Sequence, residues 1–196
     1  MTIDEICEKY EIENYTINDD GTIDVNGNVD LDRKYLTELP LRFNKVTGYF
    51  DCTKNNLTTL KGSPIWVGGY FYCSENSLTN LEFSPEYVGR TFYCGVNKNL
   101  TSLIGSPKIV GGEFNCNSCD IKDPKGCSEK IGSNFYCINT PLSSIFNHVD
   151  RHFLHAFNFY KVIKDDTINL KRLKYVMELY DKNISLYQIK KYYKVI

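Results

Sequence analysis

The sequence has no long apolar run and almost no net charge, and both absences exclude classes of protein. It carries 23 Lys and Arg against 24 Asp and Glu, for a net charge of −1, so no global attraction to nucleic acid is expected. No apolar stretch approaches the length of a transmembrane helix. The opening MTIDEICEKYEI is acidic where a secretory signal is basic and then apolar. We therefore expect a cytoplasmic protein without a membrane partner.

The motifs of common enzymes are also missing. There is no glycine-rich phosphate loop, no H-E-x-x-H and no nucleophile elbow. The Val-Gly-Gly sequences at residues 67–69 and 110–112 recur as turns, where glycine supplies permissive backbone angles. We predict neither an enzyme nor a bound cofactor.

What the sequence does contain is an internal repeat of 21 or 22 residues. One apolar position recurs as Val29, Phe50, Phe71, Phe92, Phe114 and Phe135. Two residues later stand Leu31, Cys52, Cys73, Cys94, Cys116 and Cys137. Three of the units continue with Asn55, Asn76 and Asn97. The unit then closes with a valine or isoleucine, usually just before glycine.

The repeat F-x-C-x-x-N-x-L-x-x-L resembles the leucine-rich repeat, with Phe and Cys in place of two leucines, over residues 27–146. Its short form, with proline after the second leucine, is similar to that of bacterial effector proteins. The phrase LTSLIGSPKIVGG resembles uncharacterised leucine-rich repeat proteins of tailed bacteriophages. The resemblance implies an α/β solenoid, a right-handed array of about six tiers with one parallel sheet.

Elementary geometry explains the repeated cysteine. Phe71 and Cys73 are two residues apart on a strand, so both point to the interior. Parallel pairing of successive tiers then stacks Cys73 between Cys52 and Cys94, where a thiol behaves as a small apolar group. The asparagine turns inward and satisfies backbone groups that water cannot reach. We expect each tier to be one strand with an irregular return.

The two ends differ from the repeat, and we predict caps there. Residues 1–26 read as a helix followed by a hairpin with an Asp-Gly turn. Residues 147–196 read as a helical cap. The first of its helices is predicted from the apolar spacing of Phe146, Val149, Phe153, Phe157 and Tyr160. A second is predicted to open at Asp165, Asp166 and Thr167, and a short third to run over residues 185–193.

Two groups of residues have metal-ligand character. Cys116, Cys119, Cys127 and Cys137 begin with C-x-x-C, which also occurs in structural zinc sites. The repeat phase, however, assigns Cys116, Cys119 and Cys137 to the stacked interior without a metal. His148, His152 and His155 are spaced for one helix face. That face lies opposite the apolar stripe, and we interpret it as solvated; metal binding is the alternative in both cases.

The outward positions of the strands suggest the function. They place on one face Tyr49, Asp51, Tyr70, Tyr72, Tyr93, Glu113, Asn115 and Tyr136. Tyrosine is enriched at protein interfaces, although aromatic residues also favour strands and pair across them. We interpret this face as the binding surface for a protein partner. The phage resemblance implies that the partner is a host or defence protein, bound or inhibited in the host cytoplasm.

The alternative function is binding of a small ligand or a nucleic acid. In that case the tyrosines would stack on bases, and the basic C-terminal helices around Lys171, Arg172 and Lys174 would contact phosphates. Acidic residues on the same face argue against nucleic acid.

Overall fold

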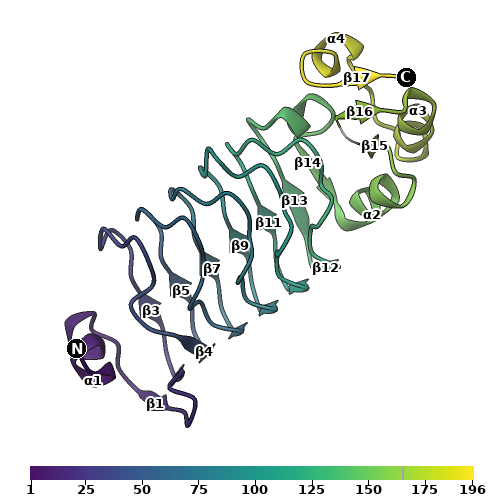
Figure 1. Cartoon of the computed structure of the whole chain (residues 1–196). Helices are drawn as coiled ribbons and strands as arrows, with labels where there is room; N and C mark the ends of the chain where they lie inside the picture. The colour runs from purple at the N-terminus through teal and green to yellow at the C-terminus, as the bar shows by residue number, and fades with distance from the viewer. Residues whose placement is uncertain (165) are drawn as a thin grey trace.

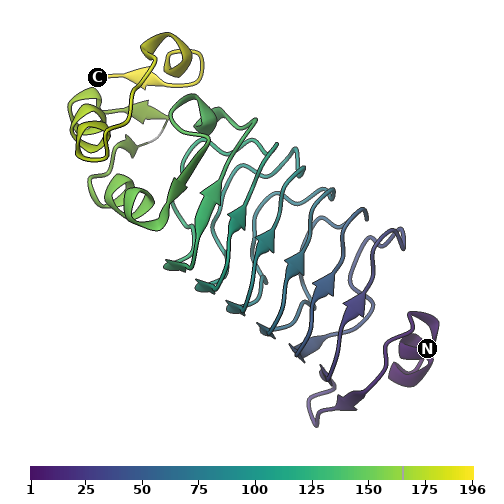
Figure 2. The same cartoon turned by 180° about the vertical axis from the view of Figure 1, so that it is seen from behind.

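The computed structural model describes residues 1–164 and 166–196, and His148 by its backbone alone. These residues form a β-solenoid of about five stacked turns with short helices at both ends (Figures 1 and 2). Asp165, predicted as a helix cap, lies outside the described residues.

Two sheets run along the solenoid, where the sequence pattern predicted one. The first sheet has the order β1 (Tyr15–Ile17), β2 (Ile23–Val25), β4 (Phe43–Val46), β6 (Trp66–Val67), β8 (Tyr87–Val88), β10 (Ile109–Val110) and β12 (Lys130–Ile131). The second has β3 (Val29–Asp30), β5 (Phe50–Asp51), β7 (Phe71–Tyr72), β9 (Phe92–Tyr93), β11 (Phe114–Asn115), β13 (Asn134–Tyr136) and β14 (His148–Asp150). The return of each turn is therefore not wholly irregular.

The Phe and Cys columns fill the core as the sequence predicted. Phe71 pairs in register with Phe50 and Phe92, and its ring stacks on both neighbours at 5.4 Å with interplanar angles of 7°. Cys73 is fully buried, and its thiol contacts the carbonyl of Tyr93 in the next turn at 3.4 Å. A thiol at this position is thus both a small apolar group and a weak donor to the adjacent turn.

The inward asparagines hold the loop that follows each second-sheet strand. Asn97 is fully buried; its amide donates to the carbonyls of Cys73 at 3.1 Å and Cys94 at 2.8 Å. Its Oδ1 accepts the Leu78 N–H at 3.1 Å. One side chain thereby satisfies backbone groups of neighbouring turns, as predicted. In the next turn Cys119 takes this place, with its thiol 3.4 Å from the Cys94 carbonyl.

A column of glycines sets the spacing where the chain leaves the first sheet. A Cβ on Gly89 would lie 2.1 Å from the carbonyl oxygen of Gly68, and one on Gly111 would lie 2.2 Å from that of Gly89. Side chains are therefore excluded at this corner by the approach of adjacent backbones. The Gly89 and Gly111 N–H groups donate to Val67 and Val88, each at 2.8 Å, which continues the ladder past the strands.

The predicted helix and hairpin are present at the N-terminal end. Helix α1 (Ile3–Lys9) begins with a capping box in which Thr2 and Glu5 bond each other's backbone. Strands β1 and β2 pair antiparallel, and β2 also pairs in parallel with β4. The hairpin is thus continuous with the first sheet.

The C-terminal unit (residues 147–196) is less helical than predicted. After a short 3₁₀ helix (Pro141–Ser144) come β14, α2 (Arg151–Phe159), β15 (Ile163–Lys164), β16 (Thr167–Ile168), α3 (Leu170–Leu179), α4 (Leu186–Ile189) and β17 (Lys194–Val195). Strands β15, β16 and β17 form a three-stranded sheet that the sequence pattern did not reveal. Within residues 1–164 and 166–196, no helix has the length and apolar character that a bilayer crossing requires.

Two predicted helix boundaries in this unit were wrong. Asp150 caps α2 by accepting hydrogen bonds from the N–H groups of His152 and Phe153. Val149 therefore precedes the helix; it lies in β14 and pairs with Phe135 of β13. The cap of α3 is Asn169, whose side chain accepts the Arg172 N–H at 3.0 Å. Thr167, predicted as a cap, lies in a strand instead.

Candidate binding surface

The outward side chains of the second sheet form a continuous surface. Parallel pairing places the residue that follows the inward Val or Phe of each strand beside its counterparts in adjacent turns. This row reads Asp30, Asp51, Tyr72, Tyr93, Asn115 and Tyr136. The row passes from acidic through aromatic to polar along the solenoid.

Four of the predicted tyrosines form one aromatic group, called here the tyrosine cluster: Tyr49, Tyr70, Tyr72 and Tyr93. Tyr72 lies at its centre, stacked on Tyr93 at 5.1 Å and on Tyr70 at 5.5 Å, with Tyr49 edge-on at 6.5 Å. Burial and then the adjacent Tyr93 raise the pKa of Tyr72, so the Tyr72 hydroxyl is uncharged at neutral pH. These half-buried rings make a preformed, amphipathic surface.

Among the other predicted residues, Asp51 pairs directly with Tyr72 and Asn115 pairs directly with Tyr93, whereas Tyr136 lies outside the cluster. Tyr136 is separated from Tyr93 by strand β11, where Asn115 occupies the row. Its hydroxyl lies 3.4 Å from Glu113 Oε1 and 3.4 Å from the Asn134 amide nitrogen. The structure thus divides the predicted face into the tyrosine cluster and a polar group around Tyr136.

Arg90 belongs to the surface but was not predicted. Its guanidinium lies over the Tyr70 ring at 5.5 Å, which is cation–π geometry. The signal was present in the sequence, because Arg90 stands where two other repeats have the second glycine of Val-Gly-Gly. On the first sheet a second unpredicted stack joins Trp66 and Tyr87 at 5.5 Å, with Lys45 over the indole.

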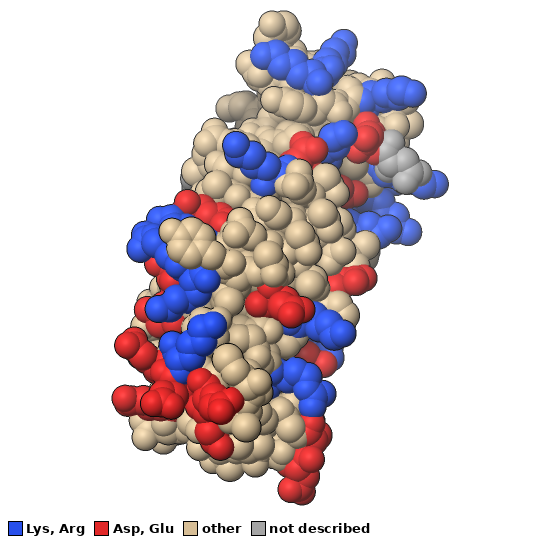
Figure 3. Space-filling model, turned by 60° about the vertical axis from the view of Figure 1, so that its left-hand side comes forward, with Lys and Arg blue, Asp and Glu red and all other residues tan. Residues whose placement is uncertain are grey.

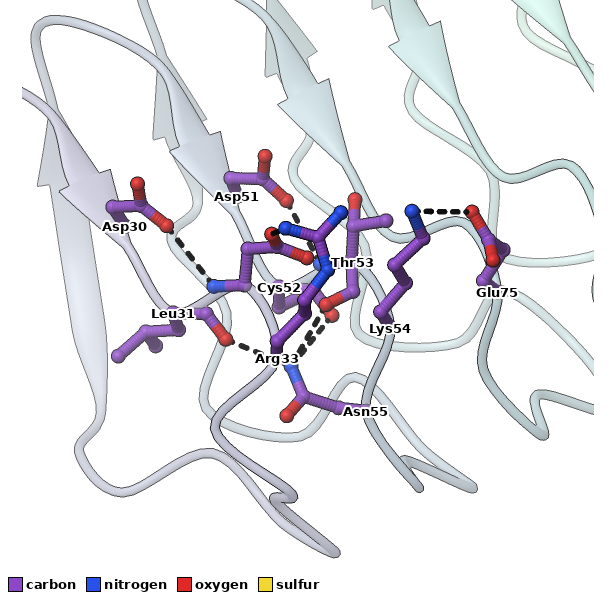
Figure 4. Close-up of polar contacts among 10 residues, drawn as sticks. Asp30, Leu31, Arg33, Asp51, Cys52, Thr53, Lys54, Asn55 and Glu75 are labelled. Atoms are coloured by element: carbon purple, nitrogen blue, oxygen red, sulfur yellow. Dashed lines mark hydrogen bonds and ion pairs between the residues drawn. The ribbon is translucent and has the colours of Figure 1, made fainter.

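Carboxylates gather at the N-terminal end of the face (Figure 4). Asp30 accepts the Asp32 N–H at 3.0 Å, and Asp51 accepts the Thr53 N–H at 2.8 Å. Burial raises the pKa of Asp51; the Thr53 hydrogen bonds oppose this shift, and the Asp32 and Asp30 charges add to it. Asp32 pairs with Arg33 at 2.9 Å, yet its Oδ1 is buried with no hydrogen-bond partner among the described residues. This end of the face therefore carries more carboxylates than cations, since Arg33 and Lys54 accompany Asp30, Asp32, Asp51 and Glu75.

Replacing Asp51 with Asn is expected to raise the free energy of unfolding by about 0.5 kcal/mol at pH 7, since like charges on paired strands destabilise each other. Asn keeps the bond to residue 53, as Asn115 does with the Asn117 N–H at 3.1 Å. A carboxyl whose pKa is raised by folding gains stability when protonated, so the advantage should vanish as the pH falls through the pKa of Asp51. Urea unfolding at several pH values, with the exposed Asp19→Asn as control, measures it; a loss of stability at pH 7 would contradict the assignment.

Three of the four cysteines considered as a zinc site, Cys116, Cys119 and Cys137, are buried in the core, where the repeat phase predicted them. The thiol of Cys116 contacts the Tyr136 carbonyl at 3.3 Å, and that of Cys137 contacts the Phe146 carbonyl at 3.0 Å. Burial raises the pKa of Cys119 to about 11 and that of Cys137 to about 12, so both thiols are neutral at pH 7 in this structure. Among the described residues, no group of three or more Cys, His, Asp or Glu is placed to hold a metal ion.

The three histidines do not share a helix face, which corrects the prediction. His148 lies in β14, where its backbone pairs with Tyr136. His152 and His155 lie on α2 and are exposed. The helix is shorter than the apolar spacing indicated because Asp150 caps it one residue before Arg151.

Basic residues lie at the far end from the acidic ones. Lys171, Arg172 and Lys174 are exposed on α3, in the unit beyond the last turn of the solenoid (Figure 1). Residues 142–196 contain 10 Lys and Arg against 5 Asp and Glu, whereas residues 1–32 contain 10 Asp and Glu and one Lys. The resulting charge gradient is visible along the molecule in Figure 3. The tyrosine cluster and the basic helices are therefore separate surfaces.

Comparison with protein families, with curated proteins and with solved structures finds no match to this chain.

Proposed function

We propose that this chain is a protein-interaction module and that its partner docks on the outward face of the second sheet. The observation that carries the proposal is the tyrosine cluster, in which Tyr72 is stacked between Tyr70 and Tyr93. Rigid aromatic side chains lose little conformational entropy on binding, and such residues dominate the affinity of typical interfaces.

The surroundings of the cluster favour a protein over a nucleic acid. Its rings already stack on one another, as Tyr72 does on Tyr93. On the N-terminal side, the residue paired with Tyr72 is Asp51. Phosphates would be repelled by the carboxylates of Asp30, Asp32 and Asp51. A complementary partner presents an apolar or aromatic patch to the tyrosines and basic side chains to the acidic end.

We further propose that the solenoid is of the leucine-rich repeat type, with residues 1–26 and 147–196 as its caps. The repeat pattern over residues 27–146 supports the type. Support for the caps comes from the antiparallel strands that end the sheets, β1 on β2 and β14 on β13, because uncapped repeats expose apolar surface. The resemblance of the repeat to phage proteins supports a host or defence protein as the partner that we propose.

Tyr72→Ala and Tyr93→Ala are each expected to weaken partner binding by about 2 kcal/mol, roughly 30-fold. Both side chains point away from the core, so the melting temperature should change little. The partner is first captured from a host lysate with the intact chain and identified, and purified partner is then titrated calorimetrically.

Tyr87→Ala is the matched control, since it removes a stacked tyrosine from the first sheet. Equal affinities for the wild type and both second-sheet variants would reject the surface. Loss of binding by Tyr87→Ala alone would move the interface to the first sheet.

A further inference from the structure

A cavity lies between the last turn of the solenoid and the C-terminal unit, away from the tyrosine cluster. Its volume is about 710 Å³, within the range of small-molecule sites. Its walls come from the loop at residues 123–126, the end of α2, strand β15 and the first turn of α3. Segments distant in sequence therefore converge on one space.

The cavity has an apolar floor and a basic rim. Phe157, Val162 and Ile163 line its inner side, called here the floor, and Ile163 is the most exposed of the three, at 8%. The rim carries four exposed cations, called here the rim cations: Lys125, Lys161, Lys164 and Arg172. The floor therefore offers a small apolar area, and the rim offers positive charge.

Among the described lining residues, the cations outnumber the carboxylates by four to two. Of the two carboxylates, Asp166 pairs with Lys122 at 3.3 Å, and Asp123 accepts the backbone N–H of Lys125 at 2.9 Å and keeps its charge. In the described part of the chain, none of the rim cations forms an ion pair. Four mutually repelling cations beside an apolar surface would be stabilised by a bound anion.

Arg172 is the best-placed donor. Its Nη1 donates to the Lys161 carbonyl at 3.3 Å, which ties the guanidinium to the rim and leaves further N–H groups available. A planar guanidinium matches the oxygens of a phosphate in a two-bond contact, which a lysine ammonium does not. A phosphate carries more charge than a single carboxylate, so it matches several cations better.

We propose that this cavity binds a small phosphorylated organic anion, with its phosphate groups at the rim cations and its organic group on the floor. This site is independent of the partner surface proposed above. Since its walls come from both the solenoid and the C-terminal unit, its occupant would also hold the two together.

Calorimetric titration of the intact chain with adenosine diphosphate, inorganic pyrophosphate and adenosine tests the proposal. We expect one-site binding of the diphosphate, at least 10-fold weaker binding of pyrophosphate, which uses the rim alone, and no detectable binding of adenosine. Absence of one-site binding by both phosphate compounds would overturn the proposal.

Variants separate this site from general charge attraction. Arg172→Gln is expected to weaken diphosphate binding at least 10-fold, Arg172→Lys by less, and Lys9→Gln, in α1 at the opposite end of the molecule, not at all. If Lys9→Gln weakened diphosphate binding as much as Arg172→Gln, the binding would depend on net charge alone, and the site would be rejected. Much tighter binding of a 20-nucleotide single strand, with a steep salt dependence, would instead indicate an extended nucleic-acid surface. Tyr72→Ala should leave diphosphate binding intact, so failure here and failure of the partner surface are distinguishable.

Discussion

Replacing Asn97 with Ala is expected to lower the free energy of unfolding by about 3 kcal/mol. The side chain is fully buried, and the Leu78 N–H bonds to its Oδ1 at 3.1 Å. The substitution leaves that N–H unpaired, weakens the pairing of the Cys73 and Cys94 carbonyls, and opens a small cavity. A buried group left unpaired costs roughly 1–3 kcal/mol, and the cavity adds to this.

The matched control is Asn76→Ala, one turn earlier. Asn76 makes the same contacts, to the Cys52 carbonyl at 2.9 Å and from the Leu57 N–H at 3.0 Å, but it is only half-buried. Water should replace part of its bonding, so the loss is expected to be smaller than at Asn97. Urea unfolding measures both variants. A loss below about 1 kcal/mol at Asn97 would mean that these bonds contribute little.

Replacing Phe92 with Ala is expected to have the largest effect on stability, lowering the free energy of unfolding by about 3–5 kcal/mol. Its ring has no exposed surface and lies 5.4 Å from the Phe71 ring and 5.2 Å from the Phe114 ring. Removing it leaves a void in the middle of the column, which the backbone hydrogen bonds of both sheets prevent from collapsing.

Phe159→Ala, at a phenylalanine on α2 that is 70% exposed, provides the control and should change stability by less than about 0.5 kcal/mol. Thermal and urea unfolding report both variants. A similar small change at Phe92 would show that the turns close over the void, contrary to the packing described above.

The repeating core was predictable because its signals recur at a fixed interval. Each copy of Phe, Cys and Asn supports the same register. The repeat therefore predicted that Asn97 points inward, which a single asparagine would not have indicated. The strand that each turn contributes to the first sheet was not predicted. It is only two residues long in most turns, as in β8, and two residues show no alternation.

The C-terminal unit was predicted less well because nothing there repeats. The spacing of Val149 and Phe153 fits a helix, but it fits a strand followed by a helix equally well. Asp150 decides between them through its hydrogen bonds to His152 and Phe153. Asp150 is a common helix-capping residue, but a prediction based on apolar periodicity alone does not use it.

The candidate surface was predictable in composition but not in grouping. Alternation along a strand placed Tyr72 and Tyr136 on the same face, as the structure does. Their separation depends on which residues occupy the intervening turns, here Tyr93 and Asn115. The cavity at the C-terminal unit was not predictable, because it brings together residues 123–126 and residues 157–172.

The glycine corner divides each repeat into a part that tolerates mutation and a part that does not. Any side chain at Gly89 or Gly111 would collide with the preceding turn, so a substitution there disturbs two repeats at once. The outward side chains of the second sheet do not meet the backbone of the preceding turn in this way. Outward substitutions can therefore accumulate one turn at a time, while selection holds glycine at corner positions such as Gly89 and Gly111.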